Sequence, residues 1–330
     1  MRVALIAVQL EIGAACVRTP EAYRAHLEAA AARAIAAAGP ADARFVVFPE
    51  VAGHLALLAL APPSAHKAKS LGAALAASAV RRPLDVLRGA FTTRLLDPKH
   101  AVIAALAPDA EKFWRGVFGP LARRHEAYIV AGSHLRLAPS GDLTNASLLF
   151  GPDGRVLSTT DKVNLVPGLE DRGPKGLGLA RGDADALPIV DTPIGPVCTL
   201  VCYDGFREAH TANERFVAMG PKVAARGGVT IVANPAANPW PWRARWIFAD
   251  PGEPGSREDQ WNREGLRGSL VGKGFARWGV TAHLVGEVLD QVFDGQSEIL
   301  EYDATHGAVR LLARAERHDH GEHVAVTVTC

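Results

Sequence analysis

The 330-residue sequence is poor in the features that mark several classes of protein. Its four cysteines form no CxxC pair, so neither a disulfide framework nor a cysteine-based zinc site is expected. Its 36 basic and 35 acidic residues nearly balance, which argues against a general affinity for nucleic acid or anionic membrane. No apolar run approaches the length of a membrane-spanning helix. These absences favour a cytoplasmic protein with no metal site, nucleic-acid partner or membrane segment.

Apolar residues, by contrast, make up 48% of the chain and charged residues 22%, which is the balance of a globular protein with a sizeable core. No stretch has linker composition and no internal repeat is visible, so a single domain over residues 1–330 is expected. The first eight residues resemble the start of a signal peptide. Because their apolar run is short and Gln9 and Glu11 interrupt it, we interpret them as a buried strand.

Strand and helix patterns alternate early in the chain, and strands dominate its end. The first helix has clear limits, with Thr19 as N-cap, Pro20 at the first position and Gly39-Pro40 as the stop. Strands are predicted at residues 2–9, 44–49, 127–132, 145–150, 155–160, 196–202, 229–233, 280–285, 297–302, 308–313 and 323–329. Further helices are predicted at 55–126, 207–226 and 258–277. The first of these three is interrupted at Pro62-Pro63, Pro83 and Pro98. Hairpins interrupt the alternation, so the predicted class is α/β with a mixed sheet.

Three short β-prone runs each end in a reactive side chain. One run ends at Glu50, a second at Lys162 and a third at Cys202, which is followed by the turn residues Tyr203-Asp204-Gly205. Each feature alone is usually a strand that meets solvent, or a cysteine in the core. Together the three strand ends suggest a carboxylate, an ammonium and a thiol that meet in one site.

The sequence motifs around these residues are Phe-Pro-Glu at 48–50, Asp-Lys-Val-Asn-Leu-Val-Pro-Gly-Leu-Glu at 161–170 and Cys-Tyr-Asp-Gly at 202–205. These motifs resemble those of the nitrilase, or carbon–nitrogen hydrolase, superfamily. Residues 228–235 and 293–297 add two further segments of the family's pattern. The joint occurrence of these motifs in the right order is specific to the superfamily, and the resemblance spans nearly the whole chain.

The resemblance implies a four-layer αββα sandwich with mixed sheets, and assembly into a homodimer or higher homo-oligomer. It implies that Glu50, Lys162 and Cys202 form the catalytic triad, with Glu170 as the family's second glutamate. A metal or organic cofactor is not part of this chemistry. The candidate substrate-binding residues are Tyr203, Asn234 and Trp240.

The activity implied is hydrolysis of a non-peptide C–N bond in a small or medium amide, through a cysteine thioester. Tyr203-Asp204 after the nucleophile is more typical of amidases and carbamoylases than of nitrilases, which more often carry Trp-Glu there. Two alternatives stay open. The chain could be a nitrilase or an N-carbamoyl amino acid hydrolase, or it could be a catalytically idle interaction protein with the same fold.

The sequence also departs from the family's pattern. Arg207 stands where a proline is usual and His283 where an asparagine is common. The interval from Glu50 to Lys162 is long, which implies a helical insertion around residues 55–115 that could wall the pocket or serve as an outer surface. Cys198 is interpreted as a small buried hydrophobe on the same strand face as Cys202.

Overall fold

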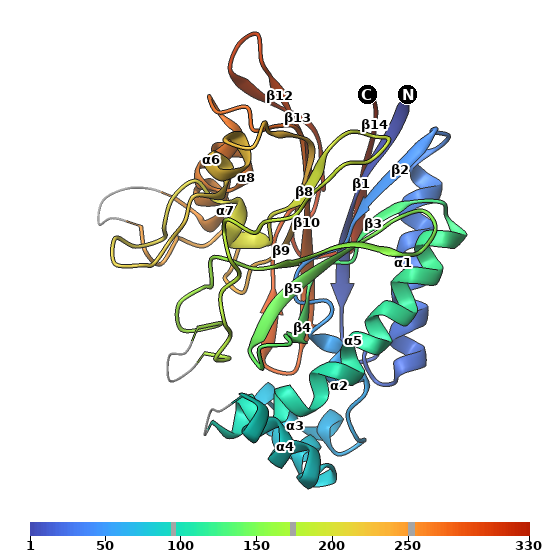
Figure 1. Cartoon of the computed structure of the whole chain (residues 1–330), viewed down its shortest axis with the longest axis vertical. Helices are drawn as coiled ribbons and strands as arrows, with labels where there is room; N and C mark the ends of the chain where they lie inside the picture. Colours follow the sequence, from blue (N-terminus) through green and yellow to red (C-terminus); the bar gives the residue numbers. More distant parts are fainter. Residues whose placement is uncertain (94–96, 172–175, 250–254) are drawn as a thin grey trace.

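The computed structural model describes residues 1–93, 97–171, 176–249 and 255–330, and two β-sheets packed face to face form its centre (Figure 1). The first sheet comprises β1 (Arg2–Ile12), β2 (Ala43–Val47), β3 (Tyr128–Val130), β4 (His134–Leu137), β5 (Leu143–Phe150), β6 (Val156–Asp161) and β14 (Glu322–Thr329). The second comprises β7 (Ile189–Val190), β8 (Val197–Thr199), β9 (Val229–Ala237), β10 (Ala276–Val288), β11 (Gln291–Phe293), β12 (Glu298–Asp303) and β13 (Ala308–Arg314).

Helices cover the outer face of each sheet. Their bounds are α1 (Pro20–Ala38), α2 (Leu55–Ala59), α3 (Leu71–Arg81), α4 (Pro83–Thr93), α5 (Pro98–Arg124), α6 (Met219–Ala224), α7 (Arg257–Glu264) and α8 (Leu266–Leu270), with 3-10 turns η1 (Ala65–Lys67) and η2 (Cys202–Gly205). In Figure 1, α1 and α5 lie on one side of the sheets and α6 to α8 on the other. The layers therefore run helix, sheet, sheet, helix, as the αββα prediction requires.

Three apolar clusters separate these layers. Ile6 faces the α1–α5 layer, whereas its neighbour Leu5 faces the space between the sheets. The second sheet packs its outer face on α6 and α8, for example through Met219 and Leu270. Because both faces of β1 are buried, the strand reads as a continuous apolar run rather than an alternating one. That burial explains the likeness of the first eight residues to a signal peptide.

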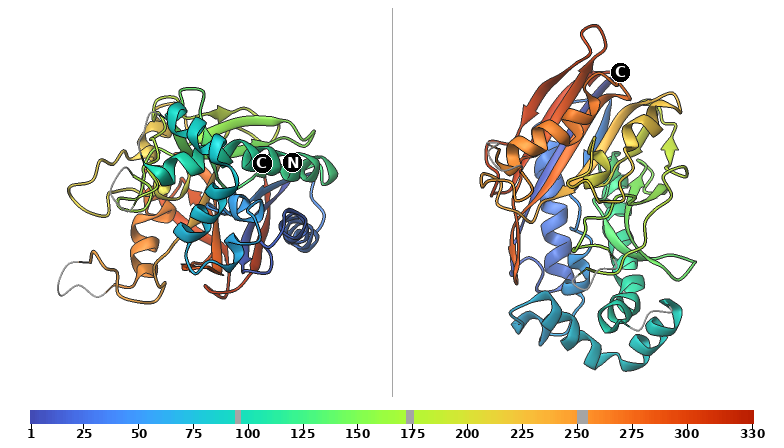
Figure 2. Two further views of the ribbon diagram at one scale, coloured as in Figure 1. Left: turned by 90° about the horizontal axis from the view of Figure 1, so that it is seen from below. Right: turned by 90° about the vertical axis from the view of Figure 1, so that its left-hand side faces the viewer.

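Parallel pairing brings one set of strand ends to the same edge. β1 runs parallel to β2 and to β10, and β9 runs parallel to β10 and to β8. Residues 10–12 of β1 pair with residues 284–286 of β10, which joins the two sheets into one curled surface. The short helices α3 and α4 gather near the carboxyl ends of these strands, at the lower end in Figure 1 and in the right-hand view of Figure 2. Open α/β sheets bind ligands at this edge.

The first helix and the proline breaks are confirmed. Thr19 caps α1 through its side chain, which accepts a hydrogen bond from the Ala22 N–H, and Gly39 ends the helix with φ of +72°. Helices α4 and α5 begin at Pro83 and Pro98.

Three element predictions are wrong. Residues 207–218 form turns and only α6 is helical, because the side chains of this segment pack around Tyr203. The predicted helix at 258–277 breaks at Gly265 and ends at Leu270, after which β10 begins. The strand before the nucleophile ends at Thr199, so Cys198 and Cys202 do not share one face of a strand. The glycine-rich sequence at 163–186 indicates a loop, and residues 172–175 of it lie outside the described residues.

No helix among the described residues is both long enough and apolar enough to cross a bilayer.

Candidate active site

The four residues predicted as catalytic lie together beyond the ends of their strands. Glu50 follows β2, Lys162 follows β6 and Cys202 lies in η2 after β8. The Lys162 Nζ atom is 2.7 Å from Glu50 Oε1 and 2.6 Å from Glu170 Oε2. The Cys202 Sγ atom is 3.6 Å from the backbone oxygen of Ala237, and the thiol and the Glu50 carboxylate lie close enough for each to shift the pKa of the other. One buried carboxylate therefore lies beside both the ammonium and the thiol.

Asn145 on β5 connects the two carboxylates and was not predicted as a site residue. Its Nδ2 atom donates to Glu50 Oε1 at 2.9 Å and to Glu170 Oε1 at 2.8 Å. Its backbone oxygen accepts from the Lys162 N–H, and its Oδ1 atom lies 3.2 Å from His54 Nε2. An amide in the β-prone run at 145–150 was the available signal, because a buried polar side chain needs partners.

Burial and charge pairing set the pKa values of this cluster. Burial outweighs the attraction of Lys162 and raises the pKa of Glu50 above its usual value. Burial also acts to raise the pKa of Glu170, but the Lys162 ammonium and several hydrogen bonds lower that pKa overall. Burial opposes charge on Lys162, yet the two carboxylates raise its pKa well above the usual value. Burial, followed by the charge of Glu50, raises the pKa of the Cys202 thiol well above its ordinary value.

These shifts define the resting protonation states. The thiol carries its proton, Lys162 is an ammonium and Glu170 is its ionised partner. Glu50 is the carboxylate whose proton affinity is raised toward neutrality. A base with that property can both take a proton from the thiol and give it up later.

The side chain of Asn234 hydrogen-bonds to the backbone of the turn that presents the thiol. Cys202 has φ of +47°, a conformation that residues other than glycine rarely adopt. Asn234 Nδ2 donates to the backbone oxygens of Leu200 at 2.6 Å and Cys202 at 3.1 Å. A Cβ atom at Gly205 would lie 2.7 Å from Asn234 Nδ2, so this position accepts only glycine without a shift. Asn234 is fully buried and does not line the cavity beside the cluster, so its observed contacts are with the backbone of the turn, and substrate binding by Asn234 stays a prediction.

Asp204 ties the same turn to the loop that carries the lysine. Its carboxylate accepts hydrogen bonds from the backbone N–H groups of Val163 at 3.1 Å and Asn164 at 2.6 Å. The peptide after Lys162 is thus fixed to the residue two positions after Cys202. The sequence indicated Asp204 only as a turn residue.

A cavity of about 300 Å³ opens beside the cluster. Glu50, Lys162, Glu170 and Cys202 line it, and so do Tyr203 and Trp240 among the predicted substrate-binding residues. The rest of the wall is largely apolar. Much of that wall comes from the helical segment after Glu50, through Leu55, Leu58, Leu71, Leu75 and Ile103.

The segment at 55–115 has two parts that differ in their packing. Helices α2 and α3 face the cavity. Residues 98–115 belong to α5, which reaches the cavity through Ile103, continues to Arg124 and packs Trp114 and Phe118 into the core on the first sheet. Residues 94–96 lie outside the described part of the chain. The interpretation of the segment at 55–115 as an insertion stays a prediction.

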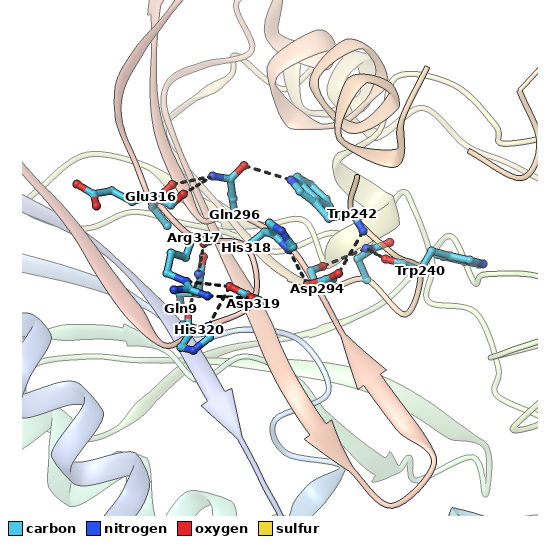
Figure 3. Close-up of polar contacts among 12 residues, drawn as sticks. Gln9, Trp240, Trp242, Asp294, Gln296, Glu316, Arg317, His318, Asp319 and His320 are labelled. Atoms are coloured by element: carbon cyan, nitrogen blue, oxygen red, sulfur yellow. Dashed lines mark hydrogen bonds and ion pairs between the residues drawn. The ribbon is translucent and has the colours of Figure 1, made fainter. Parts of the chain in front are cut away.

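The loop that carries Trp240 is fixed by the segment at 293–297 (Figure 3). The Trp242 N–H donates to the Asp294 carboxylate at 3.2 Å, and Trp242 Nε1 donates to Gln296 Oε1 at 3.2 Å. Trp242 is buried, whereas Trp240 faces the cavity. The tryptophans of this loop are therefore divided between packing and the cavity wall.

Two of the C-terminal histidines pair with carboxylates. His318 Nδ1 lies 2.8 Å from Asp294 Oδ1, and His320 Nδ1 lies 2.9 Å from Asp319 Oδ1 (Figure 3). His323 lies on β14 opposite Val8. Within the described ranges, no three His, Cys, Asp or Glu side chains gather as a metal site.

The chain belongs to the carbon–nitrogen hydrolase family, whose sequence model matches residues 2–215. A search of curated proteins gave no match. Among solved structures, the chain resembles a carbon-nitrogen hydrolase from Helicobacter pylori G27 at 15% identity and a TM-score of 0.63, covering 100% of this chain and 90% of that one. It also resembles an amidase from Nesterenkonia sp. AN1, in a mutant with acrylamide added to the active-site cysteine, at 18% identity and a TM-score of 0.56, covering 100% and 93%. The class is thus a carbon–nitrogen hydrolase with the nitrilase-like fold.

Proposed function

We propose that this hydrolase cleaves the C–N bond of a small or medium carboxamide, with Cys202 as nucleophile. The observation that supports it is the buried cluster on the cavity wall, in which Glu50 hydrogen-bonds with Lys162 and lies beside Cys202. A protonated thiol, a carboxylate of raised proton affinity and a fixed ammonium are the three parts that acyl transfer to sulfur needs.

In the first step Glu50 takes the thiol proton while the Cys202 sulfur attacks the amide carbonyl carbon. The carbonyl oxygen becomes an oxyanion, which Lys162 and the backbone N–H of Tyr203 stabilise. A preorganised donor of this kind contributes about 10²–10³ in rate. Since Lys162 is already held by two carboxylates, it needs no reorganisation when the charge develops.

In the second step the tetrahedral intermediate collapses. The C–N bond breaks, and the nitrogen leaves as ammonia or an amine after receiving the proton from Glu50. A thioester on Cys202 remains. Glu50 then takes a proton from water, hydroxide attacks the thioester carbonyl, and the sulfur leaves and recovers the proton as the carboxylic acid is released.

Glu170 and Asn145 act through the other groups. Glu170 fixes the Lys162 ammonium, and Asn145 holds both carboxylates in place. We assign both as positioning residues. Burial is the main cause of the raised pKa of Glu50, and the negative charge of Glu170 adds to it.

A substrate panel tests this function. Purified protein is incubated with short alkyl amides, ureido acids and the matching nitriles, and ammonia and acid are measured. Release of ammonia and acid from amides, lost in Cys202→Ala, is the expected result. Faster turnover of nitriles or of ureido acids would favour the rival activities, and no turnover together with slow labelling of Cys202 by a thiol probe would indicate an idle protein.

The helices after Glu50 are proposed to select the acyl group. Leu55, Leu58 and Leu75 present alkyl side chains to the cavity, and these would contact the part of the substrate beyond the carbonyl. Insertions at such a mouth alter access more than chemistry. An apolar acyl group therefore fits this wall better than a polar one.

A further inference from the structure

Arg257 is a buried cation in the same cavity that the chemistry above does not use. It begins α7, is 2% exposed and lines the cavity. Its guanidinium carbon lies 3.9 Å from the ring centre of Trp246, 4.9 Å from that of Trp240 and 5.0 Å from that of Trp261. These rings attract a cation, but they do not neutralise its charge.

The neighbours of Arg257 leave part of the guanidinium free. Nε donates to Asn238 Oδ1 at 2.9 Å, and Nη1 donates to Gln260 Oε1 and faces His210 Nε2 at 3.5 Å. Nη2 has no hydrogen-bond partner among the described residues. No described carboxylate forms a salt bridge with Arg257, since Glu264 is reached only through Gln260.

An unpaired buried charge is costly. Removing an ion from water costs several kcal/mol unless a counter-charge compensates it. Burial lowers the pKa of Arg257 to about 9, which still leaves a cation at neutral pH. His210 cannot be a second cation, because burial and then Arg257 lower its pKa to about 2. The site is therefore a single positive charge whose open nitrogen needs an acceptor.

Arg257 also lies close to the proposed nucleophile along two routes. Ala237, whose oxygen contacts the Cys202 sulfur, is followed by Asn238, which holds the Arg257 Nε. Tyr203, which follows Cys202, stacks on His210 at 4.1 Å between ring centres. A ligand of modest size in this cavity can therefore reach both the sulfur and the guanidinium.

We propose that Arg257 is a specificity residue that binds an anionic group, a carboxylate in the simplest case, on the amide substrate. This inference rests on the proposed amide hydrolysis. The carboxylate can belong to either half of the substrate, the acyl group or the departing amine. Charge-assisted hydrogen bonds from arginine are suited to this recognition.

Paired substrates test the proposal on both halves. Succinamate, glutaramate and adipamate, each with its uncharged alkyl amide of equal chain length, place the carboxylate on the acyl half. N-acylglycines, paired with N-alkyl amides of similar size, place it on the amine half. In the wild-type protein we expect kcat/KM to favour the anionic member of at least one series by on the order of 10²-fold.

Variants of Arg257 test whether this residue causes the preference for anionic substrates. Arg257→Gln should remove the preference with little change in kcat/KM for the neutral amides, and Arg257→Lys should keep part of the preference. Arg243→Gln, at an exposed position of the same loop region, is the matched control and should leave the preference unchanged. Equal losses for charged and neutral substrates in Arg257→Gln would mean a purely structural cation and would overturn the proposal.

A binding readout separates this inference from the proposed function. Calorimetry with Cys202→Ala measures affinity for the same anionic and neutral amides without turnover, and again in Cys202→Ala/Arg257→Gln. Arginine-dependent binding of anions by a wild-type protein that hydrolyses no amide would refute the function alone. Hydrolysis of neutral amides without any anion preference would refute the inference alone. If Arg257→Gln does not fold, the wild-type preference and Arg257→Lys decide.

Discussion

At the scale of single residues, two carboxylates share one ammonium, and their surroundings shift the two pKa values in opposite directions. Glu170 accepts from Lys162 and from the backbone N–H of Val166, which favour its ionised form. Glu50 lacks the backbone donor and is buried beside the thiol, so its proton affinity rises. Such separated pairs divide the roles of charge partner and proton carrier.

The first prediction concerns Glu170→Gln. Removing that negative charge favours the ionised form of Glu50, so the pKa of Glu50 should fall. The acidic limb of the kcat/KM profile, which reports the base in the free enzyme, should therefore move to lower pH while kcat decreases. Glu208→Gln, at an exposed carboxylate, is the control and should leave the limb in place. A shift to higher pH would contradict the assignment of Glu50 as base.

The second prediction separates the two buried cysteines. Cys202→Ala should abolish turnover and keep the melting temperature. Cys198 packs in the core under α6, and burial raises the pKa of its thiol to about 12, so it is an inert hydrophobe. Cys198→Ala should lower the free energy of unfolding by about 1 kcal/mol and keep most of the activity. Kinetics and thermal melts on both variants check this, and reversed phenotypes would identify the other cysteine as nucleophile.

The order of residues along the chain predicted Glu50, Lys162, Glu170 and Cys202, which do converge. Glu50, Lys162 and Cys202 each end a β-prone run, so local pattern carries their signal, whereas Glu170 was predicted from the family resemblance. Arg257 could not be found this way. Its importance depends on which rings surround it and on the absence of a described counter-charge, and neither property is local in the sequence.

At the scale of elements, the turn η2 depends on β9 beneath it, and this gives the third prediction. Asn234→Ala removes the donor to the Leu200 and Cys202 carbonyls, which leaves two buried acceptors without that partner. We expect a loss of about 1–3 kcal/mol in the free energy of unfolding. The kcat should fall while KM changes little, because the side chain does not line the cavity. A rise in KM alone would instead support substrate binding by Asn234.

The fourth prediction concerns α3 as part of the cavity wall. Leu75→Phe adds volume to a side chain that lines the cavity and should shift the preference toward shorter acyl chains. Leu84→Phe makes the same change on α4, where the side chain is 70% exposed, and should have no effect. Relative kcat/KM over alkyl amides of increasing length measures the shift. An unchanged length profile for Leu75→Phe would remove α3 from any role in specificity.

Helix ends were predictable where they are made by local chemistry, as at Thr19 and Pro20. The segment at 207–218 was not, although its composition favours a helix. His210 and Glu214 instead hydrogen-bond with the Tyr203 hydroxyl, and these tertiary contacts outweigh the intrinsic helix preference of the segment. The positive φ of Cys202 could not be predicted either, because the carbonyl of Cys202 is held by a hydrogen bond from Asn234 on another strand.

At the scale of the whole molecule, the family resemblance predicted the four layers, while composition and pattern alone reached only a mixed α/β class. The junction between residues 10–12 and 284–286 has no local signature, because it depends on two strands far apart in the chain. Assembly into a homo-oligomer and a cytoplasmic location stay predictions.

The pairing of β1 with β14 has a practical consequence for engineering. The amino group of Met1 donates to the Cys330 carbonyl at 2.9 Å, at the end of the molecule away from α3 and α4 (Figure 1). A short glycine–serine bridge could therefore join these two residues, with new ends opened in the exposed β12–β13 turn at residues 304–307. We expect such a circular permutant to keep its fold and its turnover, checked by melting and ammonia release. Opening the chain after Val201 instead should abolish activity, because the backbone that aims the sulfur would be cut.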